Sequence, residues 1–195
     1  MKKLKQDLRI IKTKDSLRHA LLALLKQKPL ETITIAELCR EATINRGTFY
    51  LHYKEVHEVF REYLEVIVED LKQSYEEPYY KTNYHIQNLE ADMIKIFHHV
   101  KKYKDFYQII FDERIPMMYY YLLFDTVRSF MKESIEEHFE LDHSIQLDYL
   151  ISYQTNAILG ILIEWHRHGY ETSIQELNQH LITILSINSP VRKMQ

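Results

Sequence analysis

Four adjacent residues carry the chemistry needed to read the edge of a base pair. Arg46 can donate two parallel hydrogen bonds to a guanine edge, and Thr48 can reach a base or a phosphate oxygen. Gly47 has no side chain, so the backbone there can lie close to a duplex. Together with Asn45, these residues form the candidate base-reading group, from which any choice of DNA sequence would mainly come.

Side chains suited to phosphate oxygens follow directly in the sequence. They supply hydroxyl, imidazole and ammonium donors at Tyr50, His52, Tyr53 and Lys54. Contacts to phosphates position a protein on DNA without selecting a sequence. We therefore expect these residues to set the placement of the protein and the base-reading group to set its specificity.

Two short helices must hold these side chains in place. Thr34, followed three residues later by Glu37, is a capping box in which each side chain satisfies a backbone donor of the other residue, so a helix begins there. Asn45 is a good N-cap for a second helix, in which Phe49 points inward. The polar residues of this second helix are then left on its open face, and a recognition helix presents its N-terminal residues to base edges.

The stretch Ile33 to Tyr53, I-T-I-A-E-L-C-R-E-A-T-I-N-R-G-T-F-Y-L-H-Y, resembles the helix-turn-helix of the TetR/AcrR family of transcriptional regulators. A helix expected from about Lys14 to Lys28 precedes it, and a long helix that begins near Glu55 follows it. Further along, Ile151 to Tyr170 resembles the C-terminal domain of Firmicutes-type members. The resemblance covers essentially the whole chain.

This resemblance implies an all-α protein of about nine helices in two domains. Residues 8–54 would form the DNA-binding domain, with the recognition helix at about 45–52, and residues 55–190 a helical domain for regulation and dimerisation. The implied partners are a palindromic double-stranded DNA operator and a second copy of the chain. The residues expected to bind DNA are Thr34, Ile35, Asn45, Arg46, Gly47, Thr48, Tyr50, His52, Tyr53 and Lys54.

Two residues depart from the family pattern. Thr43 stands where the family usually has the turn glycine, so the turn either adopts a negative φ or tolerates modest strain. Val56 stands where many members carry a lysine that holds a phosphate at the start of the long helix. Lys54 can substitute for that lysine, and Val56 is left out of the expected site.

Charge is distributed unevenly along the chain. Residues 1–60 contain 12 Lys and Arg against 7 Asp and Glu, whereas residues 61–195 contain 13 against 21. The attraction for phosphates therefore lies at the N-terminus, where a basic arm is expected ahead of the first helix. A solubilising tail is an equally good interpretation of its outermost residues. The arm consists of Lys2, Lys3, Lys5, Arg9, Lys12 and Lys14.

The later helical periodicity predicts a series of amphipathic helices. They include a long helix that ends near Pro78, a helix from Leu89 to Val100, a short one from Phe106 to Phe111 and a long one from Pro116 toward Phe139. Two further helices close the chain: one that begins near Leu147 and stops at Gly169, and one opened by the capping box of Ser173 and Glu176.

The resemblance implies that this last pair of helices meets the same pair of a second copy, so that the four helices form a dimer interface. The alternative is that its small residues pack within one subunit. The residues expected at the interface are Ala157, Gly160, Ile161, Glu164 and Leu181.

Several other classes of protein are disfavoured. The three glycines are dispersed, so there is no glycine-rich phosphate cradle, and no nucleophile elbow or zinc-protease motif occurs. The eleven histidines provide no i,i+4 chelate among their closest pairs, and the single Cys39 favours a small core residue. We therefore expect no enzyme, no metal and no cofactor, and a cytoplasmic chain without a membrane span.

The sequence thus predicts a homodimeric, sequence-specific DNA-binding regulator. Repression, with release when the C-terminal domain changes shape, is the favoured mode. A small-molecule effector could bind among the aromatic residues of that domain, although aromatics at helical spacing are more often simply core. The alternatives are a transcriptional activator, or a partner-binding helical module of the same fold that has no small-molecule inducer.

Overall fold

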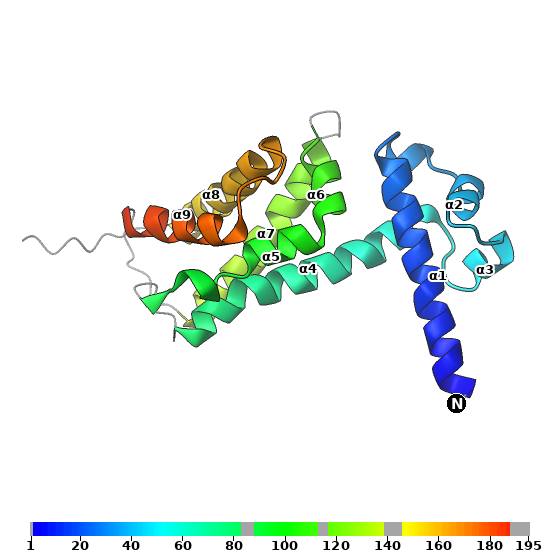
Figure 1. The fold of residues 1–195 in the computed structure, drawn as a ribbon, viewed down its shortest axis with the longest axis horizontal. Helices are drawn as coiled ribbons and strands as arrows, with labels where there is room; N and C mark the ends of the chain where they lie inside the picture. The colour runs from blue at the N-terminus through cyan, green and yellow to red at the C-terminus, as the bar shows by residue number, and fades with distance from the viewer. Residues whose placement is uncertain (1, 83–87, 113–116, 139–145, 188–195) are drawn as a thin grey trace, which may run out of the picture. The chain divides into compact units, whose positions relative to one another are not determined.

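The computed structural model describes residues 2–82, 88–112, 117–138 and 146–187 of the 195-residue chain, and within these ranges it contains nine α-helices and no strand. The chain forms two compact units, Met1–Ile67 and Val68–Gln195 (Figure 1). The expected all-α class is confirmed. None of the described helices is long and apolar enough to cross a membrane.

The N-terminal unit consists of three complete helices and the start of a fourth. They are α1 (Lys2–Leu25), the 3-10 turn η1 (Leu30–Thr32), α2 (Ile35–Glu41), α3 (Arg46–Tyr50) and the first turns of α4 (Val56–Lys81). Its core is made of residues with no exposed surface, namely Leu17, Leu21, Leu38, Phe49 and Val59. The N-terminal half of α4 therefore packs as part of this unit, which extends past the boundary expected at residue 54.

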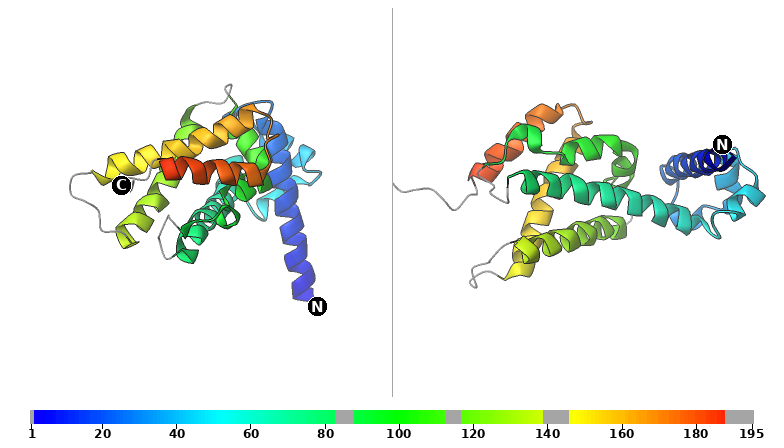
Figure 2. Two further views of the ribbon diagram at one scale, coloured as in Figure 1. Left: turned by 60° about the vertical axis from the view of Figure 1, so that its left-hand side comes forward. Right: turned by 90° about the horizontal axis from the view of Figure 1, so that it is seen from below.

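Helix α1 is longer than expected, and the residues of the predicted basic arm lie within it. It begins at Lys2 rather than near Lys14, because the first 25 residues contain no proline or glycine to interrupt it. Its N-terminal turns extend beyond the rest of the unit (Figures 1 and 2). The expectation of an arm ahead of the first helix was thus wrong. Arg9 and Lys12 are exposed on the helix.

Helix α4 starts at Val56, as expected, and runs past the proline that should have ended it. Val56 is buried, so it has a core role and not the phosphate-binding role that the resemblance implied for a lysine at this position. Pro78 lies in the last turn of α4, and the helix continues past it to Lys81 although the proline cannot donate an intrahelical hydrogen bond.

The C-terminal unit consists of the remainder of α4 and five more helices. They are α5 (Ile96–Lys102), α6 (Lys104–Ile110), α7 (Met117–His138), α8 (Leu147–Arg167) and α9 (Ile174–Ile187), with the 3-10 turn η3 (Ala91–Met93) ahead of α5. The helix expected from Leu89 to Val100 is broken, because Ile94 has an extended backbone with φ −69° and ψ 123°. Pro116 and Phe139 lie outside the described residues.

Polar contacts join α7 to α8 as antiparallel neighbours. The Tyr120 hydroxyl donates to Asn156 Oδ1 at 2.9 Å, and Arg128 pairs with Asp148 at 2.8 Å. Helix α8 ends at Arg167, and the chain leaves it at Gly169, whose φ of 64° is the left-handed conformation that glycine adopts without strain. The predicted stop at Gly169 and the capping box of Ser173 are both confirmed.

Candidate nucleic-acid interface

The capping box of α2 forms as the sequence predicted. Glu37 N–H donates to Thr34 Oγ1 at 3.2 Å, and Thr34 N–H donates to Glu37 Oε2 at 3.0 Å. Lys28 Nζ lies 2.6 Å from the other carboxylate oxygen of Glu37. The hydrogen bond from Lys28, followed by those from Thr34, lowers the pKa of Glu37 to about 2. The start of α2 is therefore fixed to the segment that follows α1.

The turn between α2 and α3 is a Schellman motif. Ile44 N–H donates to Cys39 O at 3.0 Å, and Thr43 N–H donates to Arg40 O at 3.2 Å. Thr43 occupies the left-handed position with a φ of 56°. Of the two alternatives for this residue, the negative φ is excluded and the strained turn is observed.

Helix α3 is short, and Asn45 caps its N-terminus. Asn45 Oδ1 accepts hydrogen bonds from Thr48 N–H at 2.7 Å and from the Thr48 hydroxyl at 3.0 Å. A Cβ at Gly47 would lie 3.3 Å from the same oxygen, so glycine also keeps the cap uncrowded. The α-helix spans Arg46–Tyr50, and the rest of the expected range 45–52 is its cap and following turn.

Burial divides α3 into an inner and an outer face. Phe49 has no exposed surface, as the sequence predicted, while Arg46, Gly47 and Tyr50 are exposed and Thr48 is half-buried. Among the residues that the structure describes, Arg46 has no carboxylate partner, so its guanidinium is available to a ligand. The N-terminal end of α3 thus presents donors to solvent from a rigid base.

The flanking residues differ in how well they fit a phosphate-binding role. Lys54 is exposed, His52 is half-buried, and the hydroxyl of the exposed Thr34 is already used in the cap of α2. Ile35 is half-buried. Leu51 was not expected, yet it is 78% exposed and adjoins Tyr50. Its exposure could have been predicted from helical periodicity, because Leu51 lies two residues after the inward-facing Phe49 and therefore on the opposite side.

Tyr53 does not face solvent. It is 5% exposed, and its hydroxyl donates to Glu62 Oε1 at 3.1 Å. Burial, followed by the negative charge of Glu62, raises the pKa of the Tyr53 hydroxyl. The expectation that Tyr53 contacts phosphate does not fit this placement, and we leave this residue out of the interface.

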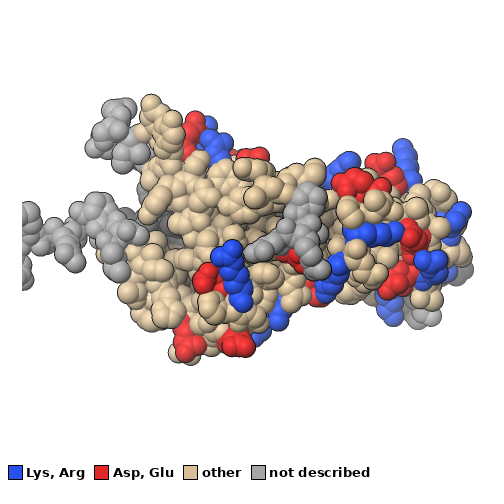
Figure 3. Space-filling model, turned by 90° about the horizontal axis from the view of Figure 1, so that it is seen from above, with Lys and Arg blue, Asp and Glu red and all other residues tan. Residues whose placement is uncertain are grey.

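Charged side chains of both signs are spread over the N-terminal unit, whereas much of the C-terminal unit in the same view has no charged side chain (Figure 3). The region of α8 from Tyr149 to Ile163 contains no Lys, Arg, Asp or Glu. The expected interface residues Ala157 and Gly160 are exposed in this region, and the charged Glu164, which follows it directly, is also exposed. Ile161 of α8 and Leu181 of α9 are half-buried. A Cβ built on Gly160 meets nothing within 4 Å, so this glycine is not packed within the subunit.

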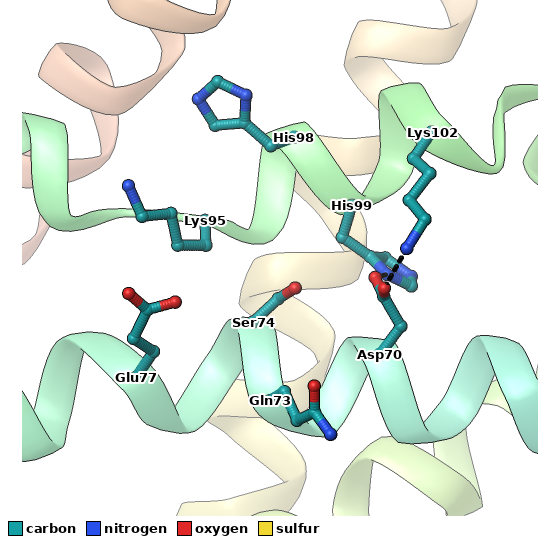
Figure 4. Close-up of a pocket in the computed structure, with 8 residues that line it drawn as sticks. All are labelled: Asp70, Gln73, Ser74, Glu77, Lys95, His98, His99 and Lys102. Carbon is teal, nitrogen blue, oxygen red and sulfur yellow. Dashed lines mark hydrogen bonds and ion pairs between the residues drawn. The ribbon is translucent and has the colours of Figure 1, made fainter.

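The C-terminal unit also contains an open polar groove of about 300 Å³ between α4 and α5 (Figure 4). At one end, the Asp70 carboxylate pairs with Lys102 and lies 2.6 Å from His99 Nδ1. The other ring nitrogen of His99 lies 2.8 Å from the Tyr107 hydroxyl. Burial lowers the pKa of His99, and the hydrogen bond to Asp70 offsets this only in part.

In the described part of the chain, no group of three or more His, Cys, Asp or Glu side chains could hold a metal ion. Cys39 is buried and burial raises the pKa of its thiol, as suits a small core residue. His99 serves as a buried hydrogen-bonding residue within the C-terminal unit.

Comparison with known proteins defines the class. Residues 87–186 match the TetR-family model described as a transcriptional regulator C-terminal region. A stretch of 56 residues is 36% identical to the uncharacterized HTH-type transcriptional regulator YxbF of Bacillus subtilis strain 168, and it covers 29% of this chain and only 14% of that protein. The crystal structure of a TetR transcriptional regulator from Streptococcus agalactiae 2603V shares the fold, with a TM-score of 0.58 at 20% identity over 93% of this chain and 98% of that one.

The chain therefore belongs to the TetR family of transcriptional regulators. Members of this family generally bind DNA, dimerise and are not enzymes.

Proposed function

We propose that this protein is a sequence-specific DNA-binding repressor that acts as a homodimer and is controlled through its C-terminal unit. One observation carries the DNA-binding part of the proposal. The first turn of α3 exposes Arg46, which has no carboxylate partner among the described residues, while Phe49 on the opposite face is fully buried. This arrangement is the one by which a recognition helix presents its N-terminal residues to the major groove.

The uncharged face of the C-terminal unit supports the homodimer. Tyr149 and Tyr153 of α8 are 74% and 61% exposed, and Ile184 of α9 is 40% exposed. Exposed apolar and aromatic residues around small ones suit a helix-to-helix contact with a second copy. A dimer also places two recognition helices on half-sites about 34 Å apart.

Control through the C-terminal unit requires space for an effector. The apolar cavity at the centre of this unit holds only about 20 Å³, room for one water molecule, between residues such as Leu71, Tyr107 and Phe130. The polar groove beside Asp70 is larger, at about 300 Å³. A small polar effector would therefore bind in the groove without any opening of the core.

Salt dependence tests the DNA-binding proposal against a helical module that binds only protein partners. With about six phosphate contacts, the logarithm of the affinity should fall with the logarithm of salt concentration at a slope of about −5. Fluorescence anisotropy on labelled duplexes measures this slope. Weak binding that is the same for every duplex would favour the partner-binding module.

A reporter fused to the target promoter separates repression from activation. Deletion of the gene that encodes this protein should raise reporter output, because an occluded promoter becomes accessible. Output that falls on deletion would identify an activator instead.

A further inference from the structure

The Glu62 carboxylate of α4 is hydrogen-bonded to side chains from two other segments of the N-terminal unit. Lys14 Nζ lies 2.6 Å from Oε2, and Arg18 of α1 lies 2.8 Å from Oε1. The Tyr53 hydroxyl, from the segment after α3, donates to Oε1 at 3.1 Å. We propose that Glu62 is the positioning residue that fixes the recognition helix α3 against α1 and α4. This inference rests on the DNA-binding role proposed above for α3.

The charge of Glu62 matters because of what surrounds it. Lys14 and Arg18 lie four residues apart on one face of α1, where two cations repel each other. The Glu62 side chain is 29% exposed and the Arg18 side chain 21% exposed, so solvent screens this repulsion only in part. Burial raises the pKa of Glu62, but the hydrogen bonds from Lys14 and Arg18 outweigh it and the net pKa is lowered. The carboxylate is thus held in its charged form.

Tyr53 connects this carboxylate to α3. Its N–H donates to Phe49 O at 3.0 Å, and the two rings lie 5.8 Å apart between centroids. Phe49 has no exposed surface and is the residue through which α3 packs into the core of the N-terminal unit. A shift of Glu62 therefore reaches α3 through the two hydrogen bonds of Tyr53 and one buried ring pair, without passing through solvent.

Helix α3 is too short to fix its own position. This helix has five residues and one side-chain cap, at Asn45, so its placement comes from its neighbours. Binding to random DNA uses phosphate contacts that tolerate small displacements, whereas base reading requires the donors to meet fixed acceptors. Loss of the Glu62 network should therefore reduce specific binding more than nonspecific binding.

The variant that tests this is Glu62→Gln, with Tyr53→Phe as the second variant and Glu65→Gln as the matched control. Glu65 lies on the same helix and is exposed. Hydrogen exchange of the α3 amides, measured without DNA on the full chain, should be faster in Glu62→Gln and in Tyr53→Phe than in the wild type. Glu65→Gln should leave it unchanged. Unchanged α3 exchange in Glu62→Gln would overturn the inference, whatever the protein does to DNA.

Affinity for DNA provides the second measurement. We expect Glu62→Gln to bind the protein's selected site about tenfold more weakly, and random DNA within about twofold of the wild type, as for the loss of one charged hydrogen bond. Equal losses on both DNAs, matched by a fall in the folded fraction, would assign Glu62 a purely structural role and overturn the inference. If the wild type selects no site, the proposed function fails, and the α3 exchange still decides whether Glu62 positions this helix.

Discussion

Arg46 is the side chain on which base reading should depend most. The Arg46→Ala variant should lose about 1 to 3 kcal/mol of binding free energy on the specific site and relax the preference at one base pair, because a bidentate contact to guanine is lost. Binding titrations on site variants measure both effects. Arg61→Ala, an exposed arginine of α4 in the same unit, is the matched control and should retain the preference. Equal losses on specific and random DNA in Arg46→Ala would remove its base-reading role.

Thr43 carries local strain that a substitution can relieve. Because its φ is 56°, Thr43→Gly should raise the free energy of unfolding by about 1 kcal/mol, as glycine adopts this conformation without a Cβ clash. The reverse change at the equivalent turn of α8, Gly169→Ala, should lower it by about the same amount. Urea titrations followed by circular dichroism provide the comparison. A less stable Thr43→Gly variant would show that its side chain makes a compensating contact.

His99 should make the C-terminal unit sensitive to acid. Burial lowers its pKa in the folded state, so the unfolded state takes up a proton first as the pH falls. The contribution of His99 to stability is thus complete above the unfolded pKa of about 6.5 and is lost as the pH falls toward the lower folded value. Urea unfolding followed by the fluorescence of Trp165, the single tryptophan, should show this loss in the wild type. His99→Gln should flatten the profile below pH 6.5; an identical slope would mean that another group titrates.

At the level of single elements, the cap of α3 serves both stability and function. Asn45→Ala should cost about 1 kcal/mol of unfolding free energy, because the hydrogen bond to Thr48 N–H is lost. Asn45→Asp keeps the cap and should keep the stability, but it places a carboxylate beside the phosphates and should weaken binding to every DNA. Thermal unfolding and anisotropy on the same samples separate the two effects. Full DNA affinity in Asn45→Asp would place Asn45 away from the duplex.

The elements predicted correctly are those whose signals are local. The caps at Thr34, Asn45 and Ser173 each depend on residues three positions apart, which a sequence displays directly. Pro78 misled the prediction because a proline favours the end of a helix without enforcing it, and Pro78 is buried, so packing can offset the lost hydrogen bond. The break at Ile94 is a backbone conformation that a run of apolar residues at helical spacing conceals.

In the candidate site, too, the sequence predicted the local features but not the contacts between distant residues. The inward placement of Phe49 follows from helical periodicity and was predicted. The burial of Tyr53 was not, because its hydroxyl partner Glu62 also binds Lys14 and Arg18, more than 40 residues away in the sequence. In a sequence, a tyrosine beside a basic motif is typical of a phosphate contact. Only the fold shows that the Tyr53 hydroxyl is already hydrogen-bonded to Glu62.

At the scale of the whole molecule, the homodimer depends on the uncharged face of α8. Gly160→Arg should yield a folded monomer, because the side chain has open space within the subunit and arginine favours a helix over glycine. In a dimer the same charge would be buried against its copy, at a cost that closely packed helices cannot offset. Sedimentation velocity measures the oligomeric state.

Ser129→Arg provides the control for Gly160→Arg, since it adds the same charge at an exposed position of α7. It should leave the dimer intact. A Gly160→Arg protein that remains dimeric would place the interface elsewhere on the molecule.

In the proposed homodimer, two copies of α3 read a specific operator. The most direct test is a selection of genomic fragments bound by the purified full-length protein, followed by titration of the enriched site against wild type and Arg46→Ala. We predict a palindrome with half-sites about one DNA turn apart, bound tightly by the wild type and weakly by the variant. A folded, dimeric wild-type protein that enriches no sequence would contradict the account.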